Sequence, residues 1–274
     1  MTEFARNLPR LNEKVANSAR MYDYFLGGCH NFAVDRKTAD LLERVYPGAR
    51  ITAYANRGFL RRVVRYLVSQ GVDQFLDLGS GVPTAGNVHE IAQAAHPDAR
   101  VVYVDVEPVA VKAAQRLLAD NPNATTFRAD LRDTRAILNH PEVESLLDLS
   151  RPVGVLMMSV LHFVPDSDDP AGVINDYRDA VLPGSFLALS HSTDAPMRAE
   201  DVEQSDLDGI LDVFTSGGSP ATLRPPAEVE RFFAGWELVE PGVVPVFDWR
   251  PEDPDEFVGS RDRIPFWGGV GRKP

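Results

Sequence analysis

The fold is decided by the stretch VDQFLDLGSGVP, residues 72–83. Its short apolar run, 74–78, is typical of a strand buried inside a sheet, and it leads directly into the glycine turn 79–81. Apolar residues at helical spacing follow from about 87 to 95. A buried strand, a glycine turn and a helix in this order form the first unit of a nucleotide-binding α/β sheet. The glycines allow a sharp turn and let a ligand approach the backbone without a Cβ in the way.

The composition is that of an ordinary globular protein, with 274 residues, 44% of them hydrophobic and 25% charged. The chain has no apolar run of about 18 residues, and its N-terminal stretch has no apolar core, so we expect neither a membrane span nor a signal peptide. A single cysteine, Cys29, leaves no internal disulfide framework and fits a reducing compartment. We therefore expect a cytoplasmic protein with no membrane partner.

The net charge of −12 argues against nucleic acid as a partner, because polyanion binders usually present a basic face. One basic group stands out in the sequence, between residues 57 and 65. Helical spacing places Arg57, Arg61 and Arg65 on one side of a helix, which we interpret as a solvated face.

Helical and extended patterns alternate along the chain, which predicts an α/β protein with a Rossmann-like, seven-stranded, mostly parallel sheet and helices on both faces. The expected strands are 74–78, 101–105, 124–128, 153–158, 185–190, 236–239 and 264–270. An acidic amphipathic helix is expected at 200–215, another helix at 227–234, and a long loop at 244–263.

Three helical patterns precede the first strand, one ending at Gly27 and two more at 33–45 and 53–68. We expect residues 1–70 to form an N-terminal helical cap and residues 71–274 to form the ligand-binding domain, the two packed as one structural unit. Aromatic residues, an arginine and a double glycine crowd into the first helix and its end, which favours a cap that closes a ligand pocket over one that only packs on the sheet.

Acidic residues follow three of the predicted strands at their carboxyl ends, where ligands of open α/β sheets bind. Asp105 is placed to accept both hydroxyl protons of a ribose, and Asp130 lies where an adenine amino group is expected. Asp77, at the start of the glycine turn, suits the ammonium group of an amino-acid tail. For each of the three the alternative is a helix cap or a turn-stabilising acid.

Details of the turn favour S-adenosylmethionine, with S-adenosylhomocysteine as product, over NAD. The dinucleotide pattern G-x-G-x-x-G lacks its third glycine here, and Pro83 removes an N–H that a pyrophosphate would use. Asp77 would also repel a pyrophosphate. Two other classes remain open: a protein that binds S-adenosylmethionine or its product without catalysis, and an NAD-dependent oxidoreductase.

Four strings carry a family resemblance: SARMYDYFLGGCHNFAVDR (18–36), ANRGFLRRVVRYL (55–67), QFLDLGSGVPTAGNVHEIAQ (74–93) and ARVVYVDVEPV (99–109). They resemble the actinobacterial S-adenosyl methyltransferases, formerly a domain of unknown function and distantly similar to the leucine carboxyl methyltransferases. The resemblance implies a class I methyltransferase fold. It also implies a set of cofactor-binding residues: Arg20, Tyr22, Tyr24, Asp77, Gly79, Ser80, Gly81, Asp105, Val106, Asp130, Leu131, Ser159, Val160 and His162.

Methyl transfer needs alignment and exclusion of water more than acid or base groups, because the methyl donor is already activated. A base is required only for an acceptor that carries a proton, and His162 is then the catalytic candidate, ahead of His191 and His30. Tyr22, Tyr24, Phe32 and Trp267 are candidates to line a pocket for a small-molecule acceptor, with core packing as the alternative. No spacing typical of metal ligands occurs, so we expect no metal.

Overall fold

The computed structural model describes residues 8–84, 86–194, 209, 211–215 and 218–274. Its centre is one sheet in the order β3-β2-β1-β4-β5-β8-β6, with β7 paired to β8. The strands are β1 Gln74–Leu78, β2 Arg100–Asp105, β3 Ala124–Arg128, β4 Gly154–Met158, β5 Phe186–Ser192, β6 Glu237–Leu238, β7 Val244–Pro245 and β8 Phe266–Arg272.

All seven predicted strands are present, and the sheet is mostly parallel as expected: β1 to β5 run parallel and β8 runs antiparallel to β5. The short strand β7 was not expected, because it falls in the segment 244–263 that the sequence predicts as a loop. Two residues paired to β8 are too few to leave a periodic pattern in the sequence.

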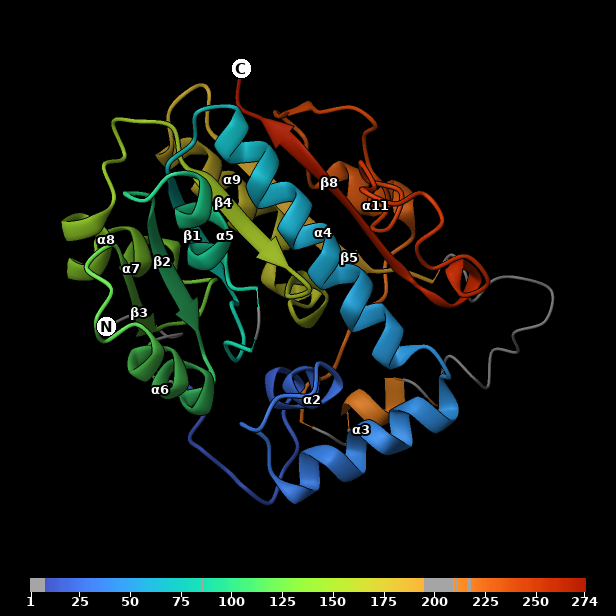
Figure 1. Ribbon diagram of the computed structural model, residues 1–274. Coiled ribbons are helices and arrows are strands. Elements are labelled where there is room, and N and C mark those ends of the chain that lie inside the picture. The colour runs from blue at the N-terminus through green and yellow to red at the C-terminus, as the bar shows by residue number, and fades with distance from the viewer. Residues whose placement is uncertain (1–7, 85, 195–208, 210, 216–217) are drawn as a thin grey trace.

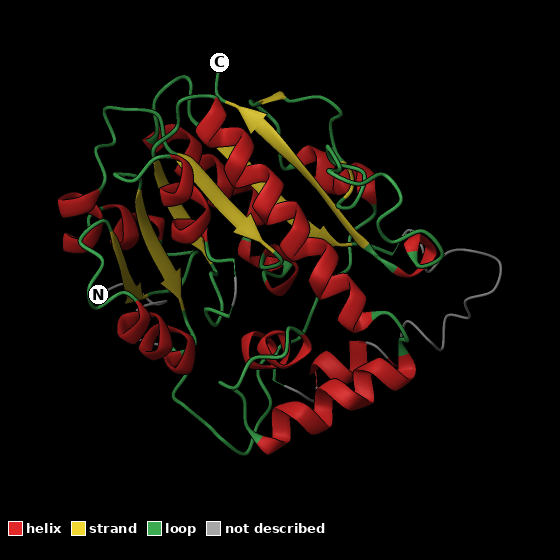
Figure 2. Cartoon of the chain, viewed as in Figure 1, coloured by secondary structure: helices red, strands yellow, loops and turns green. Residues whose placement is uncertain are grey.

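Helices cover both faces of the sheet (Figure 2). They are α2 Ser18–Phe25, α3 Ala33–Val45, α4 Ala49–Ser69, α5 Val88–Ala95, α6 Pro108–Leu117, α7 Thr134–Leu138, α8 Pro141–Leu146, α9 Pro170–Ala180 and α11 Pro226–Arg231. Strand side chains alternate between the two layers: Phe75 packs on the side of α4 and α5, and Leu76 on the side of α7 and α9. Within the expected helix 200–215, only residues 209 and 211–215 belong to the described part of the chain, and they are helical.

The helices α2 and α3 lie beyond the carboxyl ends of the strands rather than on a face, and α4 runs from them across the sheet (Figure 1). They form a core of their own, in which Met21 and Phe25 pack with Leu42 and Ala53. Helix α4 begins at Ala49, four residues before the expected start, directly after Gly48. Its extra turn carries the helix past the edge of the sheet toward α2. In the described residues, no helix has the length and apolar character needed to cross a bilayer.

Candidate functional site

A cavity of about 450 Å³ lies between the carboxyl ends of the strands and the helices α2, α3 and α4. It sits where the strand order reverses, because β1 has β2 on one side and β4 on the other. The described lining includes every residue assigned to the cofactor by the resemblance except Arg20 and Tyr24: Tyr22, Asp77, Gly79, Ser80, Gly81, Asp105, Val106, Asp130, Leu131, Ser159, Val160 and His162.

The two glycines of the turn have different physical roles. Both have a positive φ, 73° at Gly79 and 68° at Gly81, which L side chains rarely adopt. A Cβ on Gly79 would lie 2.3 Å from Cγ2 of Val160, whereas a Cβ on Gly81 would meet nothing within 4 Å. Gly79 therefore permits close packing of the turn on the β4 loop. Only Gly81 leaves open space at the cavity wall for a ligand.

Asp105 holds this turn from the end of β2. Its carboxylate accepts the N–H of Gly81 at 2.7 Å and the N–H of Glu107 at 2.8 Å. Burial raises the pKa of Asp105 to about 6, although these two hydrogen bonds act in the opposite direction. Glu107, two residues further on, also lines the cavity, so two carboxylates from one loop face it. Glu107 is absent from the site residues that the resemblance implies.

Asp77 is buried at the end of β1 and accepts no hydrogen bond from the described residues. Burial raises the pKa of its carboxyl group to about 7, with Arg57 lowering it and Asp105 raising it further. Because this carboxyl group faces the cavity and accepts no hydrogen bond from a described residue, it is free to bind a cationic ligand there.

Arg57 supplies the opposite charge. It projects from α4 into the cavity, its guanidinium lies 5.8 Å from the ring centroid of Tyr22, and its buried Nε has no hydrogen-bond partner among the described residues. The expected solvated face is therefore wrong for Arg57. Arg61 and Arg65 do lie on the exposed surface, where both pair with Glu252. The three arginines differ because of the length of α4: its first turns extend beyond the sheet to the cavity, and its later turns do not.

The third strand contributes Asp130, which lines the cavity beside Leu131. Its two carboxylate oxygens accept from Nε of Arg132 at 2.9 Å and from Nη2 at 2.5 Å. Arg132 also pairs with Asp168 in the 3₁₀ turn Asp166–Asp168, which follows β4, and the pKa of Arg132 is raised chiefly by the hydrogen bonds to Asp130. Arg132 is a lining residue that sequence reasoning missed.

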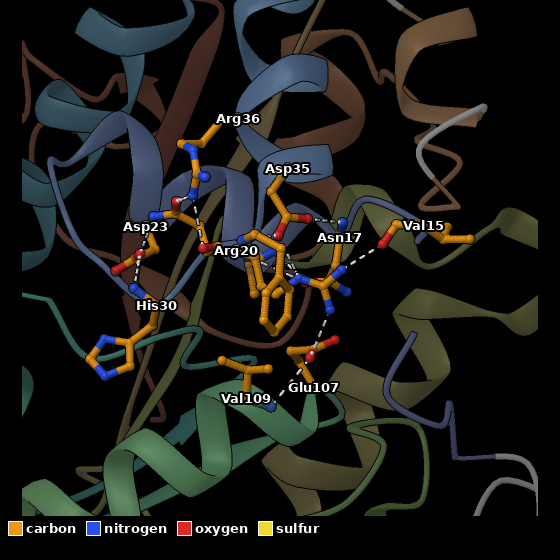
Figure 3. Close-up of polar contacts among 12 residues, drawn as sticks. Val15, Asn17, Arg20, Asp23, His30, Asp35, Arg36, Glu107 and Val109 are labelled. Carbon is orange, nitrogen blue, oxygen red and sulfur yellow. Dashed lines mark hydrogen bonds and ion pairs between the residues drawn. The ribbon is translucent and has the colours of Figure 1, made fainter. Parts of the chain in front are cut away.

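Arg20 does not line the cavity; it holds one of its walls (Figure 3). Its side chain is buried and donates to Asp35 from Nε at 2.9 Å and to Glu107 from Nη1 at 3.1 Å. Nη2 donates to the carbonyl of Val15 at 2.5 Å. Arg20 is therefore not among the described lining residues, and its guanidinium bonds instead to the N-terminal helical region and to the loop after β2.

Asp23 makes a second link between the cap and the glycine turn. One carboxylate oxygen accepts from the N–H of His30 and from Nδ2 of Asn31, both at 2.8 Å, and the other accepts from Oγ1 of Thr84 at 3.0 Å. A Cβ on Gly28 would lie 1.9 Å from Asp23 Oδ1, which explains a glycine there. Two of the strings that carry the family resemblance, 18–36 and 74–93, therefore meet in space.

Tyr24 points away from the cavity, and its hydroxyl donates to Asp40 at 3.0 Å on the exposed side of the cap. Of the four aromatic residues expected to line an acceptor pocket, Tyr22 lies in the cavity wall, and Tyr24, Phe32 and Trp267 are not part of it. Phe32 instead packs against Arg20, whose guanidinium carbon lies 5.1 Å from the centroid of the Phe32 ring.

His162 lies in the wall on the 3₁₀ turn Leu161–Phe163, directly after β4. It is buried, and its Nδ1 has no hydrogen-bond partner in the described structure. Burial, with His191 and Arg224 nearby, holds the pKa of His162 well below its usual range, so the ring is neutral at physiological pH. His191 is bonded on both ring nitrogens, to Arg224 and to the carbonyl of Ser192, and lies behind this wall.

The described residues include no group of three or more His, Cys, Asp or Glu side chains that could hold a metal ion. What the cavity offers is a row of acids at the ends of β1, β2 and β3, one unbonded arginine, and a neutral histidine after β4.

A parallel sheet with a ligand cavity at its switch point, an antiparallel strand β8 and acids after β1, β2 and β3 define a class I methyltransferase. The chain belongs to the S-adenosyl methyltransferase family, whose model matches residues 5–274. This confirms the resemblance seen in the sequence and makes S-adenosylmethionine the methyl donor.

Two solved structures are similar over nearly the whole chain. A DUF574-family protein from Streptomyces avermitilis is 38% identical, with a TM-score of 0.89, and the match covers 97% of this chain and 100% of that one. A protein from Thermobifida fusca is 40% identical, with a TM-score of 0.85 and coverages of 95% and 96%. An O-methyltransferase family protein from Burkholderia thailandensis, 16% identical with a TM-score of 0.52 and coverages of 96% and 65%, shares the fold. No curated protein matches the chain.

Proposed function

We propose that this methyltransferase acts on a small molecule bound beside S-adenosylmethionine in the same cavity. The observation that carries the proposal is the pair formed by Asp77 and Arg57. Both line the cavity, they have opposite charges, and neither side chain is hydrogen-bonded to a described residue. The tail of S-adenosylmethionine has an ammonium and a carboxylate group, which these two side chains complement.

The other lining residues fit the remaining parts of this donor. Asp105 and Glu107 would bind the ribose hydroxyls, and Asp130 with the backbone of Leu131 would bind the adenine. Gly81 lets the donor lie against the turn, since a Cβ there would project into open space. Bound S-adenosylmethionine supplies an activated methyl group; the chain's own contribution is to hold the donor and the acceptor in line and to exclude water.

His162 is our candidate for the proton acceptor when the acceptor molecule carries a hydroxyl group. The hydroxyl oxygen would form the new bond to the methyl carbon, the carbon–sulfur bond would break with its electron pair remaining on sulfur, and the hydroxyl proton would pass to the neutral imidazole. Burial holds the pKa of His162 below its usual range, so the imidazole is neutral and has a lone pair to accept this proton. Replacing it, in His162→Gln, should lower turnover with a hydroxyl acceptor and leave the affinity for S-adenosylhomocysteine unchanged; equal turnover would remove His162 from this role.

The two other classes are distinguished by binding and turnover. The absence of a third glycine and Asp77 at the turn both disfavour NAD, whose pyrophosphate would face the unpaired carboxyl group. A protein that binds S-adenosylmethionine without catalysis would need no second compartment, and here the cavity continues from the donor residues to the cap helices.

The test is calorimetric titration of the purified protein with S-adenosylmethionine, S-adenosylhomocysteine and NAD. We expect saturable binding of the first two ligands and none of NAD. Binding of NAD alone would overturn the assignment of the site residues. The variant Asp77→Asn should weaken the binding of S-adenosylmethionine and of S-adenosylhomocysteine. The same substitution at an exposed acid, Asp120→Asn, serves as the control.

A further inference from the structure

The charged residues that line the cavity are confined to one half of it. In the described lining they are Arg57, Asp77, Asp105, Glu107, Asp130 and Arg132. Five of them lie in the last residues of β1 and β2 or in the loops directly after β2 and β3, and Arg57 lies close enough to Asp77 to lower the pKa of that carboxyl group. This half is the one that the proposed function assigns to S-adenosylmethionine.

The other half, which we call the cap chamber, lies against the ends of β4, β5 and β8. Its walls come from α2, α3 and α4 on one side, with Phe25, Leu42 and Leu60, and from the sheet on the other, with Phe163 and Phe266. Among the described residues of these walls, Arg57 of α4 is the one that is charged; it lies over the ring of Tyr22 at the border with the charged half, and the proposed function assigns it to the carboxylate of the donor.

Three polar side chains near the cap chamber are linked by hydrogen bonds. Ser190 donates to Oδ1 of Asn56 at 2.6 Å, Asn56 donates to the hydroxyl of Tyr22 at 3.1 Å, and Tyr22 donates to the carbonyl of Ala53 at 3.0 Å. Burial raises the pKa of Tyr22, so its phenol stays neutral. An acceptor molecule would have to break this chain of hydrogen bonds to bond with these three side chains. The polar partner that it can reach without doing so is the neutral His162, whose Nδ1 has no hydrogen-bond partner among the described residues.

The cation behind the chamber is also fully engaged. Arg224 is buried and donates to Asp166, to His191 and to the carbonyls of Leu161 and Val164. Its charge is balanced by Asp166 at 2.6 Å, so it provides no free site for an anionic acceptor.

We infer that the methyl acceptor is an uncharged, largely apolar small molecule that occupies the cap chamber. The inference rests on the proposed function, because it needs S-adenosylmethionine in the charged half. A carboxylate or an ammonium group in the chamber would lose its hydration without gaining an opposite charge, which is a large cost. An apolar ring would instead bury its surface against Phe25, Leu42 and Leu60.

The test uses three ligands that share a 4-propylphenyl group and differ in charge: 4-propylphenol, 4-propylbenzoate and 4-propylbenzylammonium. Each is titrated into wild-type protein that is saturated with S-adenosylhomocysteine. We expect the phenol to bind at least about tenfold more tightly than either ion, a difference of about 1.4 kcal/mol or more. Equal or tighter binding of an ion, or no binding of the phenol at millimolar concentration, would overturn the inference.

Two variants test whether the preference for the uncharged ligand arises in the cap chamber. Leu42→Lys puts a cation into its wall and should reverse the preference toward 4-propylbenzoate, whereas Leu41→Lys, at an exposed site on the same helix, should change nothing. An unchanged preference in Leu42→Lys that still binds S-adenosylhomocysteine would count against the chamber. Failure of the wild type to bind S-adenosylhomocysteine would refute the proposed function itself, and the ligand series on the wild type does not depend on the folding of either variant.

Discussion

Asp77→Asn should stabilise the protein and weaken the binding of its methyl donor. The pKa of Asp77 is raised from 3.8 to about 7 in the folded protein, chiefly by burial. A raised pKa means that the folded state binds more protons than the unfolded state between these two values, so the stability of the folded protein falls as pH rises through this window. At about 1.36 kcal/mol per pKa unit, the full penalty above pH 7 is about 4 kcal/mol.

An amide has no charge to desolvate, so the variant should gain up to about 4 kcal/mol in the free energy of unfolding at pH 8, and close to nothing below pH 4. The same substitution removes a charge-assisted hydrogen bond to the ammonium of the donor, worth about 1.5–3 kcal/mol, or roughly 10- to 100-fold in affinity. Denaturant unfolding of the ligand-free protein at both pH values measures the first effect, and calorimetry with S-adenosylhomocysteine measures the second.

The exposed Asp120→Asn is the matched control and should change neither quantity. Loss of stability at pH 8 in Asp77→Asn would show that Asp77 has a structural partner and would refute the description of it as an unsatisfied carboxyl group. Unchanged affinity for S-adenosylhomocysteine would show that the ammonium binds elsewhere.

Three further predictions concern the walls of the cavity. Arg57→Met should lower the affinity for S-adenosylhomocysteine by roughly 10- to 100-fold in calorimetry. The affinity for 5′-methylthioadenosine, which lacks the amino-acid tail, should not change. Equal losses of affinity for both ligands would argue against a contact between Arg57 and the carboxylate. Gly79→Ala should lower the melting temperature more than Gly81→Ala, because the two φ values are alike but only the first methyl meets Val160, at 2.3 Å; equal shifts would contradict this. Arg20→Met should cost about 3–5 kcal/mol in denaturant unfolding, since it leaves two buried carboxylates unpaired, and an unchanged midpoint would rule out the buried network.

Acids at the carboxyl ends of parallel strands could be predicted from the sequence, because a buried strand fixes where it ends and the sheet brings those ends together. Asp77, Asp105 and Asp130 reach the cavity for this reason. The parallel direction of the first five strands could be predicted as well, since each predicted strand is separated from the next by a crossover long enough to return the chain to the same end of the sheet.

It was harder to predict from the sequence which residues of α2 line the cavity, although the helical period indicates some of them. Residues 18, 22 and 25 of α2 lie on one face and line the cavity, together with Met21. Arg20 and Tyr24, four residues apart, share a different face and have partners within the protein. The helical period therefore separates the residues that line the cavity from Arg20 and Tyr24, whereas the family resemblance assigns Arg20, Tyr22 and Tyr24 alike to the cofactor.

Arg57 could not be separated from Arg61 and Arg65 by sequence, because the three share one side of a helix at regular spacing. What distinguishes Arg57 is the length of α4 relative to the sheet, which is a property of packing. Glu107 was missed for a similar reason: as the residue before a helix-starting proline it is typical of an ordinary cap, and only the position of Arg20 shows that it is held at the cavity wall.

The most direct test of the account is a crystal structure of the complex with S-adenosylhomocysteine. We predict the adenine beside Asp130 and Leu131, the ammonium on Asp77 and the carboxylate on Arg57, with the cap chamber free for an acceptor. A ligand that lies in the cap chamber, or whose amino-acid tail points away from Asp77 and Arg57, would contradict the division of the cavity into a donor half and an acceptor half.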